Sequence, residues 1–165
     1  MKIRVEEIKE SEKETSFVEE VTEINEALAR NGLVDYQLRH PVPVALRYYR
    51  LGADLMFHGS FTGAVSGTCA RCLEAYPFSV ERDFTYVLKP SADGPARDQL
   101  AEEDLSLSSY RGNEVDISPL VREAVILSLP TRPLCSEDCS GLCPRCGVNR
   151  NTTTCSCHDE WIDPR

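Results

Sequence analysis

Six of the eight cysteines fall between positions 135 and 157. Their spacing is Cys135-x-x-x-Cys139-x-x-x-Cys143-Pro-Arg-Cys146-Gly, followed by Cys155-Ser-Cys157. A zinc ion takes about four thiolate or imidazole ligands in a tetrahedron, and a Cys-x-x-Cys turn supplies two of them from one loop. Pro144 presets the bend of such a turn, and Gly147 can adopt the positive φ that the backbone needs after it. This tail therefore predicts a zinc site, with the candidate ligands Cys135, Cys139, Cys143, Cys146, Cys155 and Cys157.

A disulfide framework is the alternative explanation for eight cysteines in a short chain. The first residues, Met1 to Glu7, contain no apolar leader, and no later stretch approaches the roughly 20 apolar residues of a membrane span. We therefore expect a cytoplasmic protein that does not enter a membrane. Thiols stay reduced in that compartment, and clustered cysteines there more often bind metal than form disulfides.

A second Cys-x-x-Cys motif stands in the middle of the chain, at Cys69-Ala-Arg-Cys72. It could be half of a metal site that tail cysteines complete, or a pair of reduced thiols that only pack. A redox pair of the thioredoxin type precedes a helix, whose N-terminus lowers the thiol pKa, whereas a strand is predicted after Cys72. A thiol oxidoreductase is thus the least favoured of the three interpretations, and the other two stay open.

The spacing alone does not decide which cysteines share an ion. The pair Cys143 and Cys146 needs two further ligands, which either the first or the last pair of the tail could supply. If Cys69 and Cys72 fold over the tail, the eight cysteines divide into two sites of four. His158 is a further candidate ligand. Four thiolates leave no open coordination position for water, so such a site is predicted to be structural rather than hydrolytic.

Alternating apolar residues predict the strands that position the central motif. Residues 54–69 and 77–88 each alternate between apolar and polar positions, which predicts an antiparallel hairpin with Cys69 and Cys72 in its loop. Glycine recurs at 59, 63 and 67 on the apolar side, where missing side chains permit bending. We therefore expect an antiparallel, strongly coiled sheet or a small barrel.

Other segments complete an α+β fold. A strand is predicted from Pro43, a short helix near residues 23–30, a charged connector over residues 10–15 and an acidic connector over residues 90–114. Ser118 is predicted to cap a helix that is apolar on most sides and so belongs in the core. The predicted organisation is an α+β hairpin or barrel domain over residues 1–133 and a cysteine-rich, zinc-ribbon-like tail over residues 134–165.

Charge restricts the classes of partner. The 165 residues carry a formal net charge of −9 and a pI of about 4.9, so the whole chain does not attract a polyanion. Direct RNA contact would need a local patch, for which the weak candidates are Arg47, Arg71 and Arg82. A basic ribosomal protein would instead be attracted, for example by the acidic run Glu102-Glu103-Asp104. No motif indicates catalysis or a small-molecule substrate, so we expect a protein that is not an enzyme.

Three segments together resemble the YceD family of bacterial proteins. They are Cys69-Ala-Arg-Cys72-Leu-Glu, Asp116-Ile-Ser-Pro-Leu-Val-Arg-Glu123 and Gly141-Leu-Cys143-Pro-Arg-Cys146-Gly147. The resemblance implies a role in the accumulation of large-subunit ribosomal RNA, and hence a partner that is this RNA, its precursor particle or a basic ribosomal protein. It also implies that the central Cys-x-x-Cys motif is more general in the family than the tail cysteines. It implies no molecular mechanism.

Overall fold

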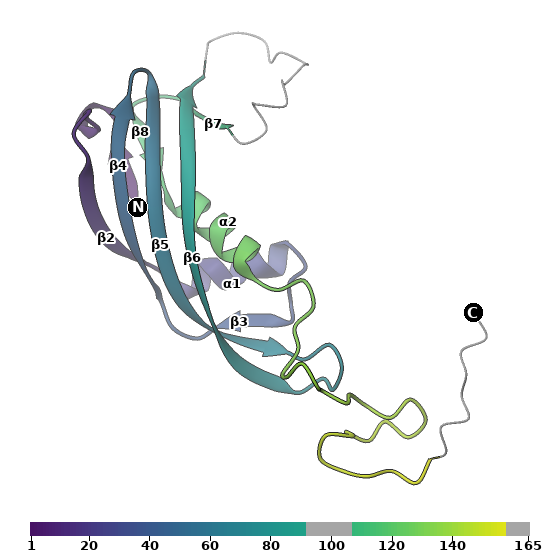
Figure 1. Ribbon diagram of the computed structural model, residues 1–165. Helices are drawn as coiled ribbons and strands as arrows, with labels where there is room; N and C mark the ends of the chain where they lie inside the picture. Colours follow the sequence, from purple (N-terminus) through teal and green to yellow (C-terminus); the bar gives the residue numbers. More distant parts are fainter. Residues whose placement is uncertain (92–106, 158–165) are drawn as a thin grey trace.

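One long antiparallel hairpin organises the molecule. The computed structural model describes residues 1–91 and 107–157 (Figure 1). The two long strands of the hairpin are followed by two short strands and a helix, and then by the cysteine tail, residues 134–157. In chain order the elements are β1 (Lys2–Arg4), a 3-10 turn (Val5–Glu7), β2 (Lys13–Glu19), α1 (Val21–Arg30), β3 (Tyr36–Leu38), β4 (Val42–Leu51), β5 (Asp54–Thr68), β6 (Ala75–Pro90), β7 (Leu107–Tyr110), β8 (Glu114–Asp116) and α2 (Ser118–Ser128).

The main sheet is open and mixed. Its strands are ordered β2-β4-β5-β6-β7, and β3 pairs with the far end of β5, beyond the end of β4. The predicted hairpin is confirmed, with Leu55 opposite Leu88 at one end and Thr68 opposite Ala75 at the other. This register places the loop that contains Cys69 and Cys72 at the tip of the hairpin, where the tail meets the sheet (Figure 1).

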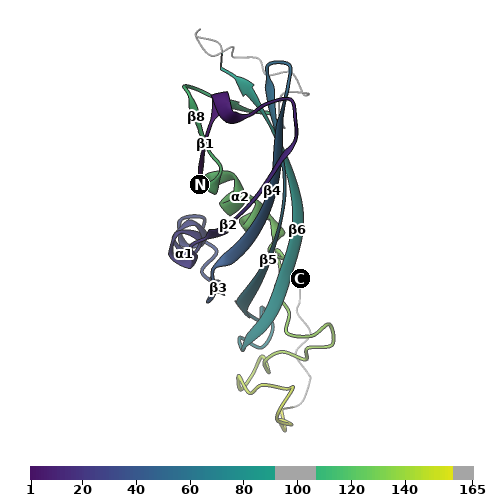
Figure 2. The same cartoon turned by 90° about the vertical axis from the view of Figure 1, so that its left-hand side faces the viewer.

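Two helices cover one face of this sheet (Figure 2). The residues of β4 that are buried, from Val42 to Tyr48, alternate with exposed ones, as a sheet covered on one side requires. Fully buried side chains of both helices join the same core, among them Ile24 and Leu28 of α1 and Val121 and Val125 of α2. The core therefore lies between the sheet and the helix layer, and within the described residues no helix covers the opposite face of the sheet.

The prediction of a small barrel is wrong. In the described parts of the chain, β2 and β7 lie at opposite ends of the strand order and do not pair, so the sheet does not close. The glycines of β5 permit close packing across the hairpin, but this packing does not require the sheet to close. The helices cover the apolar face of the sheet instead. The expectation of a purely antiparallel sheet also fails, since β7 pairs in parallel with the end of β6.

Two local predictions also need correction. Residues 10–15 were expected to be a connector, but β2 begins at Lys13, where its polar residues suit an edge strand with one solvated side. The helix predicted at Ser118 does begin there, yet Ser118 is its first residue rather than its cap. The carboxylate of Asp116 instead accepts a hydrogen bond from the backbone N–H of Ser118, at 3.2 Å. The acidic run at 102–104 and His158 lie outside the described residues.

Candidate metal centres

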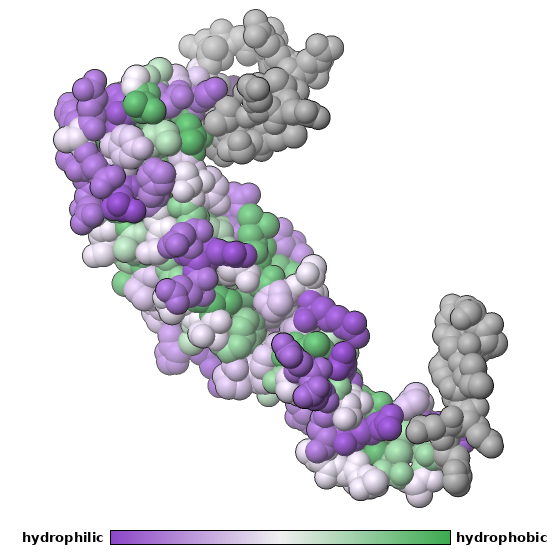
Figure 3. All heavy atoms as spheres, in the orientation of Figure 1, coloured by the Kyte–Doolittle hydropathy of each residue, from purple (hydrophilic) through white to green (hydrophobic). Residues whose placement is uncertain are grey.

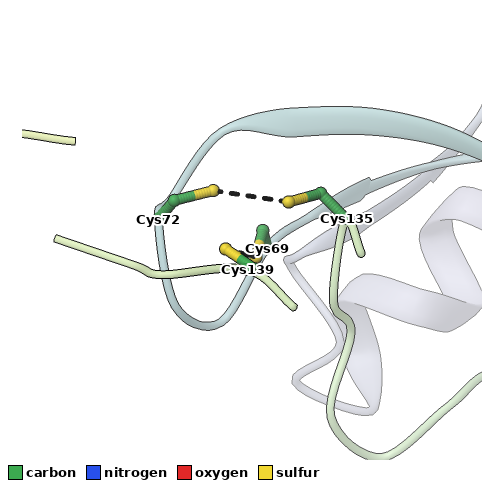
Figure 4. Close-up of side chains that lie close together, drawn as sticks. All are labelled: Cys69, Cys72, Cys135 and Cys139. Carbon is green, nitrogen blue, oxygen red and sulfur yellow. Dashed lines mark hydrogen bonds between the residues drawn. The ribbon is translucent and has the colours of Figure 1, made fainter. Parts of the chain in front are cut away.

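The eight cysteines gather into two groups of four. Within each group the sulfur atoms all lie within 4.8 Å of one another. The first group, which we call the hairpin site, joins two cysteines of the β5–β6 loop to two of the tail: Cys69, Cys72, Cys135 and Cys139 (Figure 4). The second, the tail site, lies wholly within the tail: Cys143, Cys146, Cys155 and Cys157. The central motif and the tail thus meet in space, which is the division into two sites that the spacing had left open.

The separations of the sulfur atoms suit a tetrahedral metal ion. In the hairpin site, the sulfur atoms of Cys69 and Cys139 are 3.7 Å apart, and so are those of Cys72 and Cys135. Four thiolates at about 2.3 Å from a zinc ion would be separated by about 3.8 Å along each edge of the tetrahedron. A disulfide bond requires about 2.0 Å. All eight cysteines are free thiols, so these residues fit a closed four-thiolate metal site better than a disulfide.

Each site contains the same backbone turn. In the hairpin loop, the N–H of Cys69 donates to the carbonyl of Glu74 at 2.9 Å, and the N–H of Leu73 donates to the carbonyl of Cys69 at 2.9 Å. In the tail, Cys143 N–H donates to the carbonyl of Val148 at 2.8 Å, and Gly147 N–H donates to the carbonyl of Cys143 at 2.9 Å. The Cys-x-x-Cys motif therefore folds in the same way twice, and each turn presents two sulfur atoms from one loop.

The residue after each turn adopts a left-handed conformation. Gly147 has φ of 72°, as the sequence predicted, and Leu73 has φ of 61°. A residue with a β-carbon is disfavoured there by about 1–2 kcal/mol, and Leu73 gains little from burial because it is 65% exposed. The turn at the hairpin tip is thus held by its surroundings rather than by the intrinsic preference of Leu73. Nothing in the sequence around Leu73 predicted its left-handed conformation.

Backbone hydrogen bonds attach the tail to the hairpin loop. The N–H of Ala70 donates to the carbonyl of Pro133 at 2.8 Å, and the N–H of Leu142 donates to the carbonyl of Arg71 at 3.0 Å. The guanidinium of Arg71 also donates to the carbonyls of Glu137 and Cys139, at 3.0 and 2.9 Å. Arg71 therefore orders the segment that carries the tail ligands of the hairpin site.

Asn151 connects the two sites. It follows the turn of the tail site, and its side-chain N–H donates to the sulfur of Cys139 at 3.3 Å. Its side-chain oxygen accepts a hydrogen bond from the N–H of Ser140 at 2.7 Å. The N–H of Arg150 donates to the carbonyl of Gly141 at 2.9 Å and keeps this segment beside residues 140–142, which follow the last cysteine of the hairpin site. The fold of the tail site thus places a hydrogen-bond donor on a sulfur of the hairpin site.

The thiol pKa values within each site move in opposite directions. Burial raises the pKa of Cys69, but backbone N–H groups, first that of Cys72, outweigh it and lower the pKa to about 6. The backbone N–H groups of its own turn lower the pKa of Cys143 to about 6. Hydrogen bonding to a neighbouring cysteine raises the pKa of Cys135 to about 12 and that of Cys157 to about 11. The first cysteine of each turn is thus stabilised as a thiolate, which is the form that binds metal.

The three arginines proposed for RNA contact do not share a surface. Arg47 lies opposite His58 on the open face of the sheet, and its side chain is 56% exposed. Arg82 lies opposite Phe61, whose side chain belongs to the core, so Arg82 is on the other face. Arg71 is at the hairpin tip and holds the tail. The structure therefore brings the predicted metal ligands together but separates these arginines.

No helix among the described residues is long and apolar enough to cross a membrane.

Comparison with known families adds an independent finding. Residues 57–165 match the family described as large ribosomal RNA subunit accumulation protein YceD, and this range includes the cysteines of both sites. The chain belongs to the YceD family. The resemblance inferred from the three sequence segments is thereby confirmed.

Curated relatives of this YceD chain come from bacteria and plants. An uncharacterised protein of Mycobacterium tuberculosis is 32% identical over 120 residues, which cover 73% of this chain and 56% of that protein. A maize protein named large ribosomal RNA subunit accumulation protein YCED homolog 1, chloroplastic, is 27% identical and aligns with 73% of this chain and 50% of its own length. The uncharacterised YlbN of Bacillus subtilis is 23% identical, over 100% of this chain and 92% of YlbN.

The alignments therefore span 56% of the Mycobacterium tuberculosis relative and 63% of an uncharacterised relative from Mycobacterium leprae. No solved structure matches this chain.

Proposed function

We propose that this protein is a non-enzymatic factor in the accumulation of large-subunit ribosomal RNA, and that it holds zinc in two structural sites. Membership of the YceD family carries the first part, together with the names of its maize and Arabidopsis relatives. The two groups of four cysteines support the second. The proposed setting is the compartment in which its ribosomes are assembled, the cytoplasm for a bacterial protein.

Zinc is the metal that best fits the donors. Four thiolates in a tetrahedral arrangement select zinc or iron–sulfur chemistry among biological metals, and zinc is the usual ion in sites built from paired Cys-x-x-Cys turns. Because each ion would be enclosed by four sulfur atoms, neither site would offer a coordination position to water or to a substrate. We therefore assign zinc a role in folding, which for such sites contributes about 10 kcal/mol or more.

The hairpin site would fasten the tail to the main sheet. We retain the boundary near residue 133 between an α+β domain and the tail, but two ligands of the hairpin site come from the loop between β5 and β6. Zinc there would join the two parts, so the tip of the hairpin and the tail would act as one surface. The affinity of a partner that contacts this end of the molecule would therefore depend on whether the metal is bound.

The test is genetic complementation with a quantitative RNA readout. Cells that lack the protein are supplied with the native gene, with a Cys69→Ser/Cys72→Ser variant or with an empty vector, and the ratio of large-subunit to small-subunit ribosomal RNA is measured. The native gene should restore the ratio and the vector should not. An unchanged ratio in cells without the protein contradicts the proposed function. A variant that lacks the zinc of the hairpin site and still restores the ratio contradicts only the need for that site.

Sedimentation of the native protein from a gentle lysate then separates direct from indirect contact with RNA. Migration with large-subunit precursors that ribonuclease abolishes indicates an RNA-dependent association. Migration that survives ribonuclease indicates that a ribosomal protein provides the contact.

A further inference from the structure

In residues 1–91 and 107–157, no helix covers the face of the main sheet that lies opposite α1 and α2. The residues of β4 that point to this face, Pro43, Ala45 and Arg47, are exposed, and the helices lie on the other side (Figures 1 and 2). Figure 3 looks onto this face and shows hydrophilic, pale and some hydrophobic surface mixed over the middle of the sheet. A sheet face of this kind is either solvated or a contact surface for a partner. A groove with an unbalanced charge favours a contact surface.

Strand register produces a groove across the strands. Ser16 on β2 lies opposite Ala45 on β4, which lies opposite Ser60 on β5, which lies opposite Asp83 on β6. This row of short side chains is flanked by taller rows on both sides. One flanking row contains Glu14, Arg47, His58 and Thr85, and the other contains Val18, Pro43, Thr62 and Glu81.

Two hollows follow this row of short side chains. One has a volume of about 700 Å³ and the other about 450 Å³, and both are lined by Ser16, Ala45 and Ser60. Because they share these three lining residues, the two hollows adjoin, and we call them together the sheet groove. Successive strands are about 4.8 Å apart, so the groove spans about 14 Å from β2 to β6. That length accommodates about four residues of an extended chain.

The charges of the sheet groove are unbalanced. Glu14 stands at the β2 end, and Glu81 and Asp83 stand at the β6 end; none of the three forms an ion pair within the described residues. The guanidinium of Arg47, which also lines the groove, lies 3.7 Å from the carboxylate of Glu12. Arg39 lines a separate hollow nearer the hairpin tip, together with His40. The groove is therefore acidic at both ends, in a chain whose net charge is −9.

We propose that the sheet groove binds a basic segment of a partner protein. The short side chains of its floor let the backbone of an extended segment approach the sheet. Cationic side chains about four positions apart could then reach Glu14 at one end and the pair Glu81 and Asp83 at the other. A phosphodiester backbone would meet these carboxylates with like charge, and the nearest arginine is already paired with Glu12. A protein partner is thus favoured over RNA on this face.

This proposal names the class of partner for the protein proposed above to act in ribosomal RNA accumulation. Its evidence is the shape and charge of the sheet groove.

The probe is a fluorescently labelled synthetic peptide with two arginines four positions apart in a glycine–serine background, and its anisotropy is measured at low salt. Ala45→Leu fills the floor without a change of charge, and Glu81→Gln/Asp83→Asn removes two charges with little change of shape. The matched control, Glu26→Gln/Glu114→Gln, removes two charges from exposed residues of α1 and β8.

Both groove variants should weaken peptide binding about tenfold, and the control should change it less than about twofold. An equal effect of the control and the charge variant would overturn the proposal, because it would show attraction to net charge alone. Unchanged binding by a folded Ala45→Leu variant would also overturn it. A third contradiction would be a single-stranded RNA oligonucleotide that binds the native protein and loses affinity in Ala45→Leu.

Thermal unfolding of each metal-loaded variant verifies that it is folded. Measurement of ribosomal RNA in cells that carry the groove variants keeps the two proposals apart. Weak peptide binding with normal RNA levels leaves the groove assignment intact and shows that this contact is dispensable for RNA accumulation.

Discussion

Replacement of Asn151 by alanine tests whether the two sites are coupled. The change removes the hydrogen bond from the side-chain N–H to the sulfur of Cys139, the one that the side-chain oxygen accepts from the N–H of Ser140, and a third from the side-chain N–H to the side-chain oxygen of Asn149. The first of these stabilises a thiolate ligand of the hairpin site, although Asn151 itself belongs to the segment that follows the turn of the tail site. Loss of a hydrogen bond to a metal ligand typically lowers metal affinity about 10–100-fold, or about 1.4–2.7 kcal/mol.

Two backbone amides allow each site to be followed separately. The N–H of Leu73 donates to Cys69 in the hairpin site, and the N–H of Gly147 donates to Cys143 in the tail site. Their peaks in a heteronuclear NMR spectrum are recorded while a chelator removes the metal. In Asn151→Ala, the midpoint of the Leu73 transition should move to about 10–100-fold lower chelator concentration. The Gly147 transition should move less, because Asn151 does not touch the sulfur atoms of that turn.

Thr152→Ala is the matched control. Thr152 is the exposed neighbour of Asn151, and among the described residues its hydroxyl donates only to the carbonyl of Asn149, at 3.3 Å. This variant should leave both transitions in place. The reasoning is refuted if Asn151→Ala leaves the Leu73 midpoint unchanged, or if it shifts both midpoints equally, as a general loss of tail stability would.

Two further predictions concern the core that supports the sites, and urea-induced unfolding of the metal-loaded protein measures both. A β-carbon at Gly59 would lie 2.2 Å from the ring of Phe84, whereas one at Gly63 would have its nearest neighbour at 3.4 Å. Gly59→Ala should therefore cost about 1–3 kcal/mol and Gly63→Ala less than about 1 kcal/mol; equal costs would contradict this packing. Arg122 lies 3.0 Å from Glu19, whose side chain is 5% exposed. Arg122→Met should cost about 3 kcal/mol because it leaves a buried charge unpaired, and adding Glu19→Gln should recover most of that loss.

Much of the fold could be predicted because alternation along a strand reports which face is buried. Leu55 and Phe57 are fully buried, as their alternation with Met56 and His58 required. Closure of the sheet could not be read in the same way, because glycine permits bending without specifying which strands pair. The parallel pairing of β7 could not be predicted for a related reason. It depends on where the connection after β6 brings the chain back to the sheet, and the composition of β7 does not specify that position.

The site could be predicted only in part. The residue types and the turn at Cys143 indicated metal, since the chemistry needs thiolates from a tight loop. The division into two groups was undecidable from spacing, because Cys69 and Cys72 reach the tail through the tertiary fold of the hairpin. Asn151 was missed because a single asparagine in a polar segment has no periodic pattern. Leu73 was missed because its left-handed conformation contradicts its own preference.

The most direct test of the two-site account is the zinc content of the full chain, purified under reducing conditions and measured by elemental analysis alongside protein concentration. The account predicts two ions per native chain, one for each group of four cysteines. It predicts one ion for Cys69→Ser/Cys72→Ser and one for Cys143→Ser/Cys146→Ser. A native chain with a single ion would contradict the account. So would a Cys69→Ser/Cys72→Ser chain that keeps the full native content, because the central motif would then hold no metal.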